Sequence, residues 1–415
     1  MNDDMRKVVF FLLLIFLPLS VFAQEEDYAE ASDSLVQEIP CVKDSLPWPF
    51  SVQAKLDTLL KHPMFETTQV GVMVWDLDAD SCIYRHQERQ LLRPASTMKV
   101  ITAITALDRL GGSYQFKTQL KYKGTIANRK LTGNLYCIGG MDPRFNQDDM
   151  RALVEGVKGL GIDTISGSIY ADRTMKDGDL MGEGWCWDDD NPELSPLLIG
   201  RKNLFMEKFA EKLMDANIIV QGLLLSGQCP HDAVLVETRS HSMDQVLVKM
   251  MKESDNLYAE SMLYQIAAST GHHPATAKHA QTIEKQLISK VGLVPSNYRL
   301  ADGSGLSLYN YVSAELETRL LRYAYQNDNI YHHLYPSLPI AGVDGTLKKR
   351  MIGTAAQRNV HAKTGTLTGI ISLAGYCRAA NGHLLCFAII NQGVMSGKKA
   401  RAFQDRVCVA LCATQ

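Results

Sequence analysis

Three short polar motifs, far apart in the chain, constrain the fold more than any other feature of the sequence. They are Ser-Thr-Met-Lys at 96–99, Ser-Asp-Asn at 254–256 and Lys-Thr-Gly at 363–365, in a chain of 415 residues. Each motif alone arises often by chance. In this order they offer hydroxyls, amines and an amide whose chemistry requires all three motifs to meet at one site. The fold should therefore bring both halves of the chain together in one domain.

Hydrophobic patterns at the two ends of the chain predict a single sheet, with helices in between. Between 121 and 235 short strands alternate with glycine turns, which indicates a separate inserted domain. We therefore predict an α/β (α+β) protein with a discontinuous main domain at 50–120 and 236–415 and an α+β insert at 121–235. The strands expected in the main sheet are 70–75, a short one near 83–84, 360–364, 371–376 and 384–391.

The N-terminus has the pattern of an export signal. Arg6 and Lys7 precede an apolar run, and Ala23 offers a small residue for cleavage. We expect residues 1–23 to be a signal peptide, with an uncleaved anchor as the alternative, and residues 24–49 to be a flexible acidic tail. The protein is therefore expected to be exported and periplasmic, and loosely membrane-associated if the anchor is retained.

The balance of charges excludes one class of partner. The chain has 43 Lys and Arg against 45 Asp and Glu, so it lacks the basic excess of a nucleic-acid-binding protein. The adjacent pairs His272-His273 and His332-His333 are expected at the surface, because neighbouring residues rarely bind one metal ion. The acidic run at 188–190 lacks the spaced oxygen ligands of a calcium site. We expect neither a metal nor a cofactor.

The nine cysteines allow one pair to be argued from geometry. Asn381-Gly382 predicts a two-residue hairpin loop, which would place Cys377 directly opposite Cys386. That position suits a disulfide, and two buried free thiols fit it equally well. Cys408 and Cys412 are four residues apart on a predicted helix and are expected to pack rather than bond.

The first motif pairs a nucleophile with a base. Ser96 and Lys99 are three residues apart at the start of a predicted helix, so the amine can reach the hydroxyl. A serine hydroxyl becomes a good nucleophile when a neighbouring base takes its proton. Lysine can be that base when burial or a second cation, here Lys363, lowers its pKa. Taken alone, the pair also fits a helix-capping serine beside a solvated lysine.

The second motif adds a proton relay and a binding group. Ser254 and Asn256 are two residues apart in a predicted loop between helices, which can aim both side chains into one cleft. We predict that Ser254 passes a proton to the leaving amine and that Asn256 holds the substrate backbone. An ordinary helix cap explains one of these residues but not its occurrence with the other motifs.

The third motif ends a predicted strand at a sheet edge, where an extended peptide can dock. Lys363 and Thr364 offer a cation and a hydroxyl that suit a carboxylate, and Gly365 permits close backbone approach. The backbone N–H groups of Ser96 and Thr366 are candidates for an oxyanion hole. For this motif alone, a solvated lysine beside a strand-end turn is the alternative.

The complete set of motifs resembles the D-alanyl-D-alanine carboxypeptidase/endopeptidase family, the class C low-molecular-mass penicillin-binding proteins. The resemblance extends from about residue 52 to the C-terminus. Besides the three motifs it includes Gly-Met-Asp-Pro at 140–143, Trp-Cys-Trp-Asp-Asp at 185–189, Asp-Gly-Ser-Gly-Leu-Ser at 302–307, and the stretches 94–100, 338–347, 362–367 and 372–376.

The resemblance implies a penicillin-binding, serine β-lactamase-like transpeptidase fold, in which an antiparallel five-stranded sheet carries a helical lobe and inserted domains. The interval from Ser96 to Ser254 is shorter than in relatives with two inserts, so we expect one. The implied reaction cleaves D-Ala-D-Ala bonds or D-Ala cross-links of peptidoglycan stem peptides through an acyl-enzyme on Ser96, which β-lactams would also acylate. Asp189 matches the family's aspartate that approaches the free amine of the stem peptide's diamino acid.

Two other functions are compatible with parts of the sequence. A class A β-lactamase shares the three motifs but requires a Glu-x-x-Leu-Asn loop between the second and third, and residues 257–362 contain none. A catalytically silent module that binds the cell wall or senses β-lactams would keep the site without turnover. The completeness of the motifs disfavours it.

Overall fold

The computed structural model describes residues 46–187, 191 and 193–414. The predicted signal peptide, nearly all of the predicted acidic tail, and Asp189 lie outside these residues. Within the described part, no helix is long and apolar enough to cross a bilayer. Nor do three or more His, Cys, Asp or Glu side chains there form a group able to hold a metal ion.

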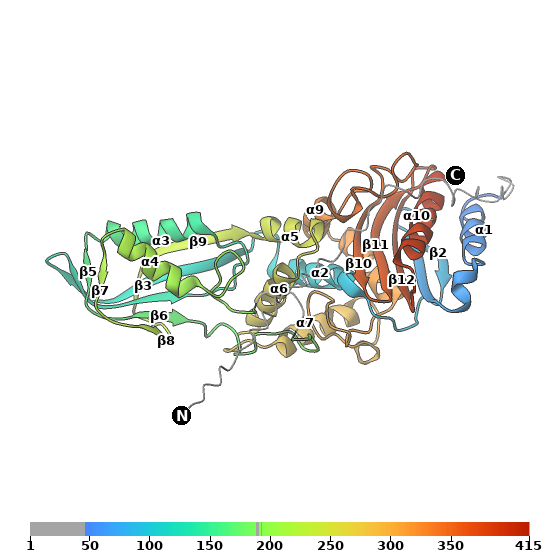
Figure 1. Ribbon diagram of the computed structural model, residues 1–415. Helices are drawn as coiled ribbons and strands as arrows, with labels where there is room; N and C mark the ends of the chain where they lie inside the picture. The colour runs from blue at the N-terminus through green and yellow to red at the C-terminus, as the bar shows by residue number, and fades with distance from the viewer. Residues whose placement is uncertain (1–45, 188–190, 192, 415) are drawn as a thin grey trace, which may run out of the picture. The chain divides into compact units, whose positions relative to one another are not determined.

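Strands from the two ends of the chain form one sheet, as predicted. Its members are β1 (Gln69–Asp76), β2 (Ser81–His86), β10 (His361–Leu367), β11 (Ile370–Arg378) and β12 (Leu384–Gln392). The order is β10-β11-β12-β1-β2, and every neighbouring pair is antiparallel (Figure 1). In β12, Phe387 and Ile389 pack on one face while Ala388 and Ile390 pack on the other. Both faces of this strand are therefore covered, with the side-chain alternation of a strand.

Helices cover both faces of this sheet. Helices α1 (Phe50–Leu59) and α10 (Gly397–Ala413) pack on one face, and α8 (Ala314–Tyr325) packs on the other. Helix α2 (Met98–Leu110) is buried from Met98 to Leu107, which fits a sequence without a continuous polar face. The helices packed around α2, besides α8, are α5 (Met243–Lys252), α6 (Asn256–Ala268), α7 (Ala277–Lys290) and α9 (Asp328–Ser337).

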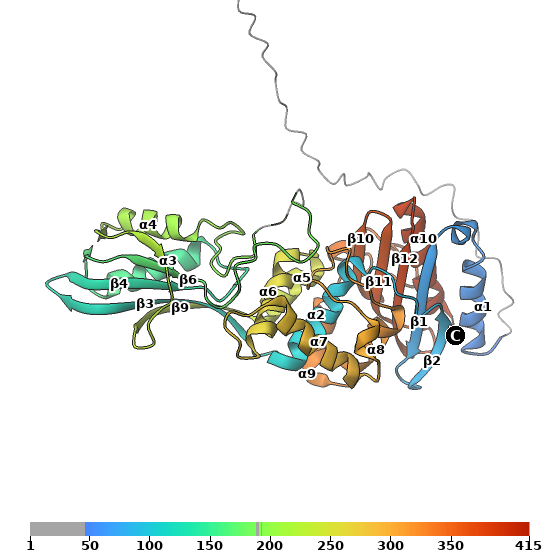
Figure 2. The same cartoon turned by 90° about the horizontal axis from the view of Figure 1, so that it is seen from below.

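The insert contains a second sheet with its own core. Its long antiparallel strands are β3 (Gln115–Ala127), β4 (Lys130–Ile138) and β9 (Val234–Ser242), and its short strands are β5 (Thr164–Ile165), β6 (Ile169–Asp172), β7 (Ile219–Val220) and β8 (Leu224–Ser226). Helices α3 (Gln147–Gly159) and α4 (Phe205–Asp215) lie next to each other against this sheet (Figure 2). The predicted bounds 121 and 235 fall inside β3 and β9, because these strands carry no turn signal where they leave the helices.

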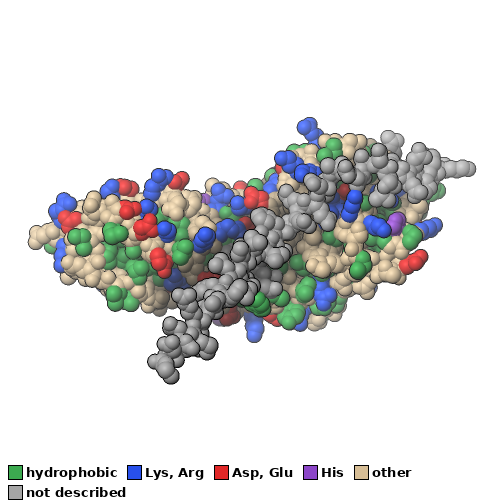
Figure 3. All heavy atoms as spheres, in the orientation of Figure 1, with side chains coloured by type: hydrophobic (Ala, Val, Ile, Leu, Met, Phe, Trp, Pro, Cys, Tyr) green, Lys and Arg blue, Asp and Glu red, His purple; other side chains and the backbone are tan. Residues whose placement is uncertain are grey.

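Charged side chains of both signs are interspersed on the face drawn in Figure 3. This pattern agrees with the near balance of 43 basic and 45 acidic residues in the whole chain.

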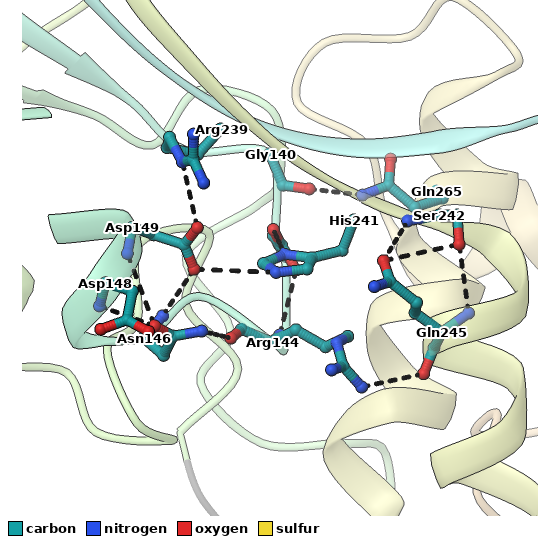
Figure 4. Close-up of polar contacts among 11 residues, drawn as sticks. Gly140, Arg144, Asn146, Asp148, Asp149, Arg239, His241, Ser242, Gln245 and Gln265 are labelled. Atoms are coloured by element: carbon teal, nitrogen blue, oxygen red, sulfur yellow. Dashed lines mark hydrogen bonds and ion pairs between the residues drawn. The ribbon is translucent and has the colours of Figure 1, made fainter. Parts of the chain in front are cut away.

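A polar cluster joins the start of α3 to the end of β9 (Figure 4). His241 Nδ1 lies 2.6 Å from Asp142 Oδ2, and His241 Nε2 lies 3.7 Å from Asp149 Oδ2. Asp149 also accepts hydrogen bonds from Arg239 Nε and from the backbone N–H of Asn146. Both carboxyl groups are buried beside the imidazole. The hydrogen bond to Asp142 raises the pKa of His241, although partial burial and the charge of Arg144 oppose the shift.

We expect His241→Gln to destabilise the protein in a pH-dependent way. A raised folded-state pKa means that the imidazolium stabilises the fold fully below the ordinary value of 6.5, and that this contribution is lost as pH rises through the folded pKa. A hydrogen bond to a charged group contributes about 1.5–3 kcal/mol. Denaturant unfolding should therefore show a large difference between wild type and variant at acid pH and a smaller one at alkaline pH. His231→Gln, at an exposed histidine, is the control, and a pH-independent difference for His241→Gln would contradict the assignment.

The hairpin between β11 and β12 corrects the predicted cysteine pair. Its loop holds three residues rather than two, because the Ala379 N–H donates to the His383 carbonyl, and Gly382 closes the loop with φ of +92°. The additional residue changes the register, so Cys377 pairs with Leu385 instead of Cys386. Cys377 and Cys386 therefore point to opposite faces of the sheet. Cys377 and Cys386 are both buried free thiols, and Cys408 and Cys412 are buried residues of α10 that pack in the core, as predicted.

Candidate active site

Ser96 lies on a short 3-10 turn, η3 (Ala95–Thr97), that leads directly into α2. The turn begins at Ala95, whose φ of +49° is uncommon for a residue with a side chain. Thr97 Oγ1 lies 2.9 Å from the Pro94 carbonyl oxygen and 2.5 Å from Glu317 Oε1. Burial raises the pKa of Glu317 to about 8, while the hydrogen bond that Thr97 Oγ1 donates to its carboxyl group acts in the opposite direction. These bonds fix the backbone that carries Ser96.

The Lys99 amine has three hydrogen-bond acceptors around it. Its Nζ lies 2.9 Å from Ser96 Oγ, 2.8 Å from Asn256 Oδ1 and 2.7 Å from the Ser304 carbonyl oxygen, and the side chain is fully buried. An ammonium can donate to all three acceptors. A neutral amine has two hydrogens, which suffice for the amide and the carbonyl, and its lone pair then faces the hydroxyl. This geometry suits a base that takes the Ser96 proton.

The surroundings of Lys99 also favour its neutral form. Burial lowers the pKa of Lys99 to about 8, although the nearby carboxyl groups of Asp302, Glu260 and Asp255 act in the opposite direction. A pKa near the working pH is what general-base catalysis requires. Any reaction that uses this amine as the base should slow as pH falls below that value.

Lys363 and Ser254 form a second contact pair beside the first. Lys363 Nζ donates to Ser254 Oγ at 2.8 Å and to the Thr364 carbonyl at 2.7 Å. The Lys363 side chain is fully buried, and burial together with the charge of Lys99 lowers its pKa well below the usual value. Ser254 has φ of +60°, a strained backbone of the kind found at functional sites. The Ser254 hydroxyl thus accepts from one lysine while its own proton remains available.

Asn256 has a different local setting from the one predicted. It is the first residue of α6 rather than part of a loop, because Asp255 acts as the N-cap and accepts from the Tyr258 N–H. Asn256 still points into the site, since its Oδ1 accepts from Lys99. Its Nδ2 donates to Asn191 Oδ1 at 3.0 Å. Asn191 is thus a neighbour of the site that the sequence did not single out.

Strand β10 is an edge of the main sheet and brings the third motif against the nucleophile. A side chain at Gly365 would place its Cβ 2.9 Å from the Ser96 backbone nitrogen and 2.7 Å from the Pro94 carbonyl oxygen, so only glycine fits without displacing the turn. Thr364 Oγ1 donates to Thr346 Oγ1 at 2.7 Å, and Thr366 is exposed. An extended peptide could pair with this edge and lie across Ser96.

The loop at 302–310 holds the Lys99 amine in position, a role that the sequence analysis did not assign to it. Asp302 accepts from the backbone N–H groups of Gly305 and Ser307 and from Asn310 Nδ2. It also accepts from Trp185 Nε1 at 2.8 Å. The loop in turn presents the Ser304 carbonyl to Lys99. The only sequence signal for this role was the Asp-Gly-Ser-Gly pattern, which marks a turn fastened by its own carboxylate.

Comparisons with curated proteins found relatives that match most of the chain. A curated D-alanyl-D-alanine carboxypeptidase from Actinomadura sp. (strain R39) is 26% identical, and the match covers 98% of this chain and 90% of that protein. The D-alanyl-D-alanine carboxypeptidase DacB from Haemophilus influenzae is 27% identical over 81% of this chain and 88% of the relative.

A solved structure shares the fold. The crystal structure of penicillin-binding protein 4 from Haemophilus influenzae matches with a TM-score of 0.78 at 25% identity, covering 85% of this chain and 97% of that one. The D-Ala-D-Ala carboxypeptidase 3 (S13) family matches residues 52–197 and 199–414, which include all three motifs. The chain therefore belongs to the D-Ala-D-Ala carboxypeptidase 3 (S13) family of serine peptidases.

Proposed function

We propose that the protein removes the terminal D-Ala from peptidoglycan stem peptides as a serine-type D-Ala-D-Ala carboxypeptidase, and that it also cleaves D-Ala cross-links as a DD-endopeptidase. The observation that carries this proposal is the 2.9 Å contact between the buried Lys99 amine and Ser96 Oγ. Family membership and the names of the relatives support the substrate class. Beyond its bridge from His361 to Ile340, β10 is an edge of the sheet, where either a stem peptide or a cross-linked peptide can pair with it.

In the proposed reaction, Ser96 Oγ attacks the carbonyl carbon of the penultimate D-Ala while Lys99 takes the hydroxyl proton. The backbone N–H groups of Ser96 and Thr366 stabilise the negative charge that develops on the carbonyl oxygen. The C–N bond then breaks as Ser254 gives its hydroxyl proton to the leaving amine, and the proton held by Lys99 passes to Ser254, which leaves the amine of Lys99 neutral again. Water hydrolyses the resulting ester on Ser96, with Lys99 again acting as the base.

Four further residues bind the substrate in this proposal. Lys363 and Thr364 hold the terminal carboxylate, because an amine and a hydroxyl can both donate hydrogen bonds to it. Asn256 holds the substrate backbone with its amide. Asp189 approaches the free amine of the diamino acid, a role taken from the family resemblance.

The proposed substrate also implies where the enzyme works and what would inhibit it. We propose an exported, periplasmic enzyme whose first 23 residues are a signal peptide, since peptidoglycan lies outside the cytoplasm. β-Lactams would acylate Ser96, because they present a strained amide in the place of the D-Ala-D-Ala bond. In support, a solved complex of Haemophilus influenzae penicillin-binding protein 4 contains a β-lactam.

Purified protein incubated with defined muropeptides tests the proposal by the masses of the products. Uncross-linked pentapeptides should lose one D-Ala, cross-linked dimers should yield monomers, and the Ser96→Ala variant should produce neither change. Prior treatment with benzylpenicillin should block both reactions. Rapid turnover of nitrocefin would favour the β-lactamase alternative. Stable penicillin binding without any muropeptide product would favour the silent module.

A further inference from the structure

Three carboxyl groups from separate elements form a buried cluster, and two of them, Glu260 and Asp302, act on the Lys99 amine. Glu260 comes from α6, Glu284 from α7 and Asp302 from the loop before α8, and their exposures are 1%, 1% and 2%. Buried carboxyl groups are costly unless they are hydrogen-bonded, paired or neutral. The hydrogen bonds of Asp302 are described above. The other two glutamates therefore need an explanation of their own.

Glu260 is connected to the catalytic amine through one residue. Its Oε1 accepts from the Gly303 N–H at 3.0 Å and from the Ser304 N–H at 2.8 Å. The carbonyl of the same Ser304 accepts from Lys99 Nζ at 2.7 Å. Gly303 packs closely on α6, where an added Cβ would lie 3.0 Å from the Ala259 carbonyl oxygen. The loop backbone thus lies between the Glu260 carboxylate and the Lys99 amine and is fixed on both sides.

The charges around Glu260 define its electrostatic role. Asp302 and Glu284 face it as acids, Lys99 faces it as a base, and Tyr264 lies nearby on the same helix. Burial and the Asp302 carboxylate raise the pKa of Glu260 to about 8, while hydrogen bonds from Ser304 and Gly303 and the charge of Lys99 favour the ionised form. Lys99 titrates in the same range, so the two groups influence each other's protonation.

Glu284 differs from Glu260 in having no partners. Neither of its carboxyl oxygens has a hydrogen-bond partner among the described residues. Burial, followed by the negative charges of Glu260 and Asp302, raises the pKa of Glu284 to about 8. No hydrogen bond within the described part of the chain favours its charged form, whereas Glu260 accepts two, so Glu284 takes up a proton before Glu260 does as the pH falls.

We propose that Glu260 is a positioning residue for the general base: its carboxylate holds the Ser304 carbonyl against the Lys99 amine, and its negative charge sets the pH at which that amine becomes neutral. The proposal rests on the role of Lys99 given under the proposed function. It predicts that loss of the charge and loss of the hydrogen bonds have separate effects. A carboxylate near the amine favours the ammonium, so removing its charge makes the amine neutral at lower pH.

The test is the pH profile of Ser96 acylation by a fluorescent penicillin. The acid limb of this profile is the pH range in which the acylation rate falls as the pH is lowered. Glu260→Gln keeps an oxygen acceptor for the two backbone N–H groups but carries no charge, so its acid limb should move to lower pH by about one unit. Glu284→Gln removes a carboxyl group that has no hydrogen bond to the loop and is not among the groups that shift the pKa of Lys99, so it should leave the acid limb in place. A Glu260→Gln limb that coincides with that of the wild type would overturn the proposal, as would an equal shift in Glu284→Gln.

A second variant keeps the test decisive if Glu260→Gln fails to fold. Glu260→Asp retains the charge but is shorter by one methylene group, so it should keep the wild-type acid limb and lower the limiting acylation rate by about tenfold or more. A wild-type limiting rate in this variant would refute the positioning role. The readout is acylation by penicillin, not D-Ala release. A protein that releases no D-Ala would therefore refute the proposed substrate and leave this comparison intact.

Discussion

Lys99→Met should lower the second-order rate constant for Ser96 acylation by benzylpenicillin by about 10²–10⁴-fold, the range that general-base catalysis contributes. Methionine is unbranched and adapts to an apolar cavity, so it can occupy the fully buried site of the lysine side chain. It has no lone pair basic enough to take the Ser96 proton. Trapping of the labelled protein over time, followed by intact mass measurement, gives the rate directly.

The matched control for this variant is Lys176→Met, at another buried lysine of the chain. Lys176 pairs with Asp177 and lies over the Tyr264 ring, without contact to Ser96. The control therefore reports what the loss of a buried ammonium does to the fold in general, and its acylation rate should remain within a few-fold of the wild type. Equal acylation rates in wild type and Lys99→Met would refute the assignment of Lys99 as the base.

The convergence of the motifs could be predicted because each motif carries its own chemical signal. Ser96 and Lys99 are close in sequence, so their contact follows from helix geometry alone. The contact between Lys363 and Ser254 joins distant parts of the chain. It could be expected only because the strands at both chain ends had to form one sheet. The discontinuous sheet and the meeting of the three motifs therefore had a physical basis in the sequence.

Other parts of the site could not be predicted, since their function lies in the backbone. The Ser304 carbonyl holds Lys99, but every residue has a carbonyl, so its type gives no signal. Glu260 lies inside a helix that is buried from Leu257 to Ala267, and its sequence alone gives no reason to expect contact with another loop. The predicted register of the β11–β12 hairpin was wrong for a related reason. Asn381-Gly382 fits loops of two or three residues, and the choice depends on the local backbone conformation.

A second large effect is expected for Gly305→Ala, because Gly305 supports the turn that carries the nucleophile. Its φ is +81°, and an added Cβ would lie 1.8 Å from the Ala95 carbonyl oxygen and 2.8 Å from Met98 Cβ. The left-handed backbone costs about 1–2 kcal/mol for a residue with a side chain, and overpacking adds about 1–3 kcal/mol. We therefore expect the free energy of unfolding to fall by about 2–5 kcal/mol in denaturant titrations.

Gly305→Ala should also lower the rate of Ser96 acylation, because the added Cβ overlaps Ala95, the residue directly before Ser96. A displacement of the nucleophile by about 1 Å can lower the rate by about 10²-fold, and penicillin labelling should show a loss of at least this size. Gly353→Ala is the matched control, since Gly353 has φ of +75° and nothing within 4 Å of an added Cβ. It carries the same backbone strain without the overlap, so it should lose about 1–2 kcal/mol of stability and label at the wild-type rate. If Gly305→Ala also labelled at the wild-type rate, the loop at 302–310 would not be what holds Ser96 in position.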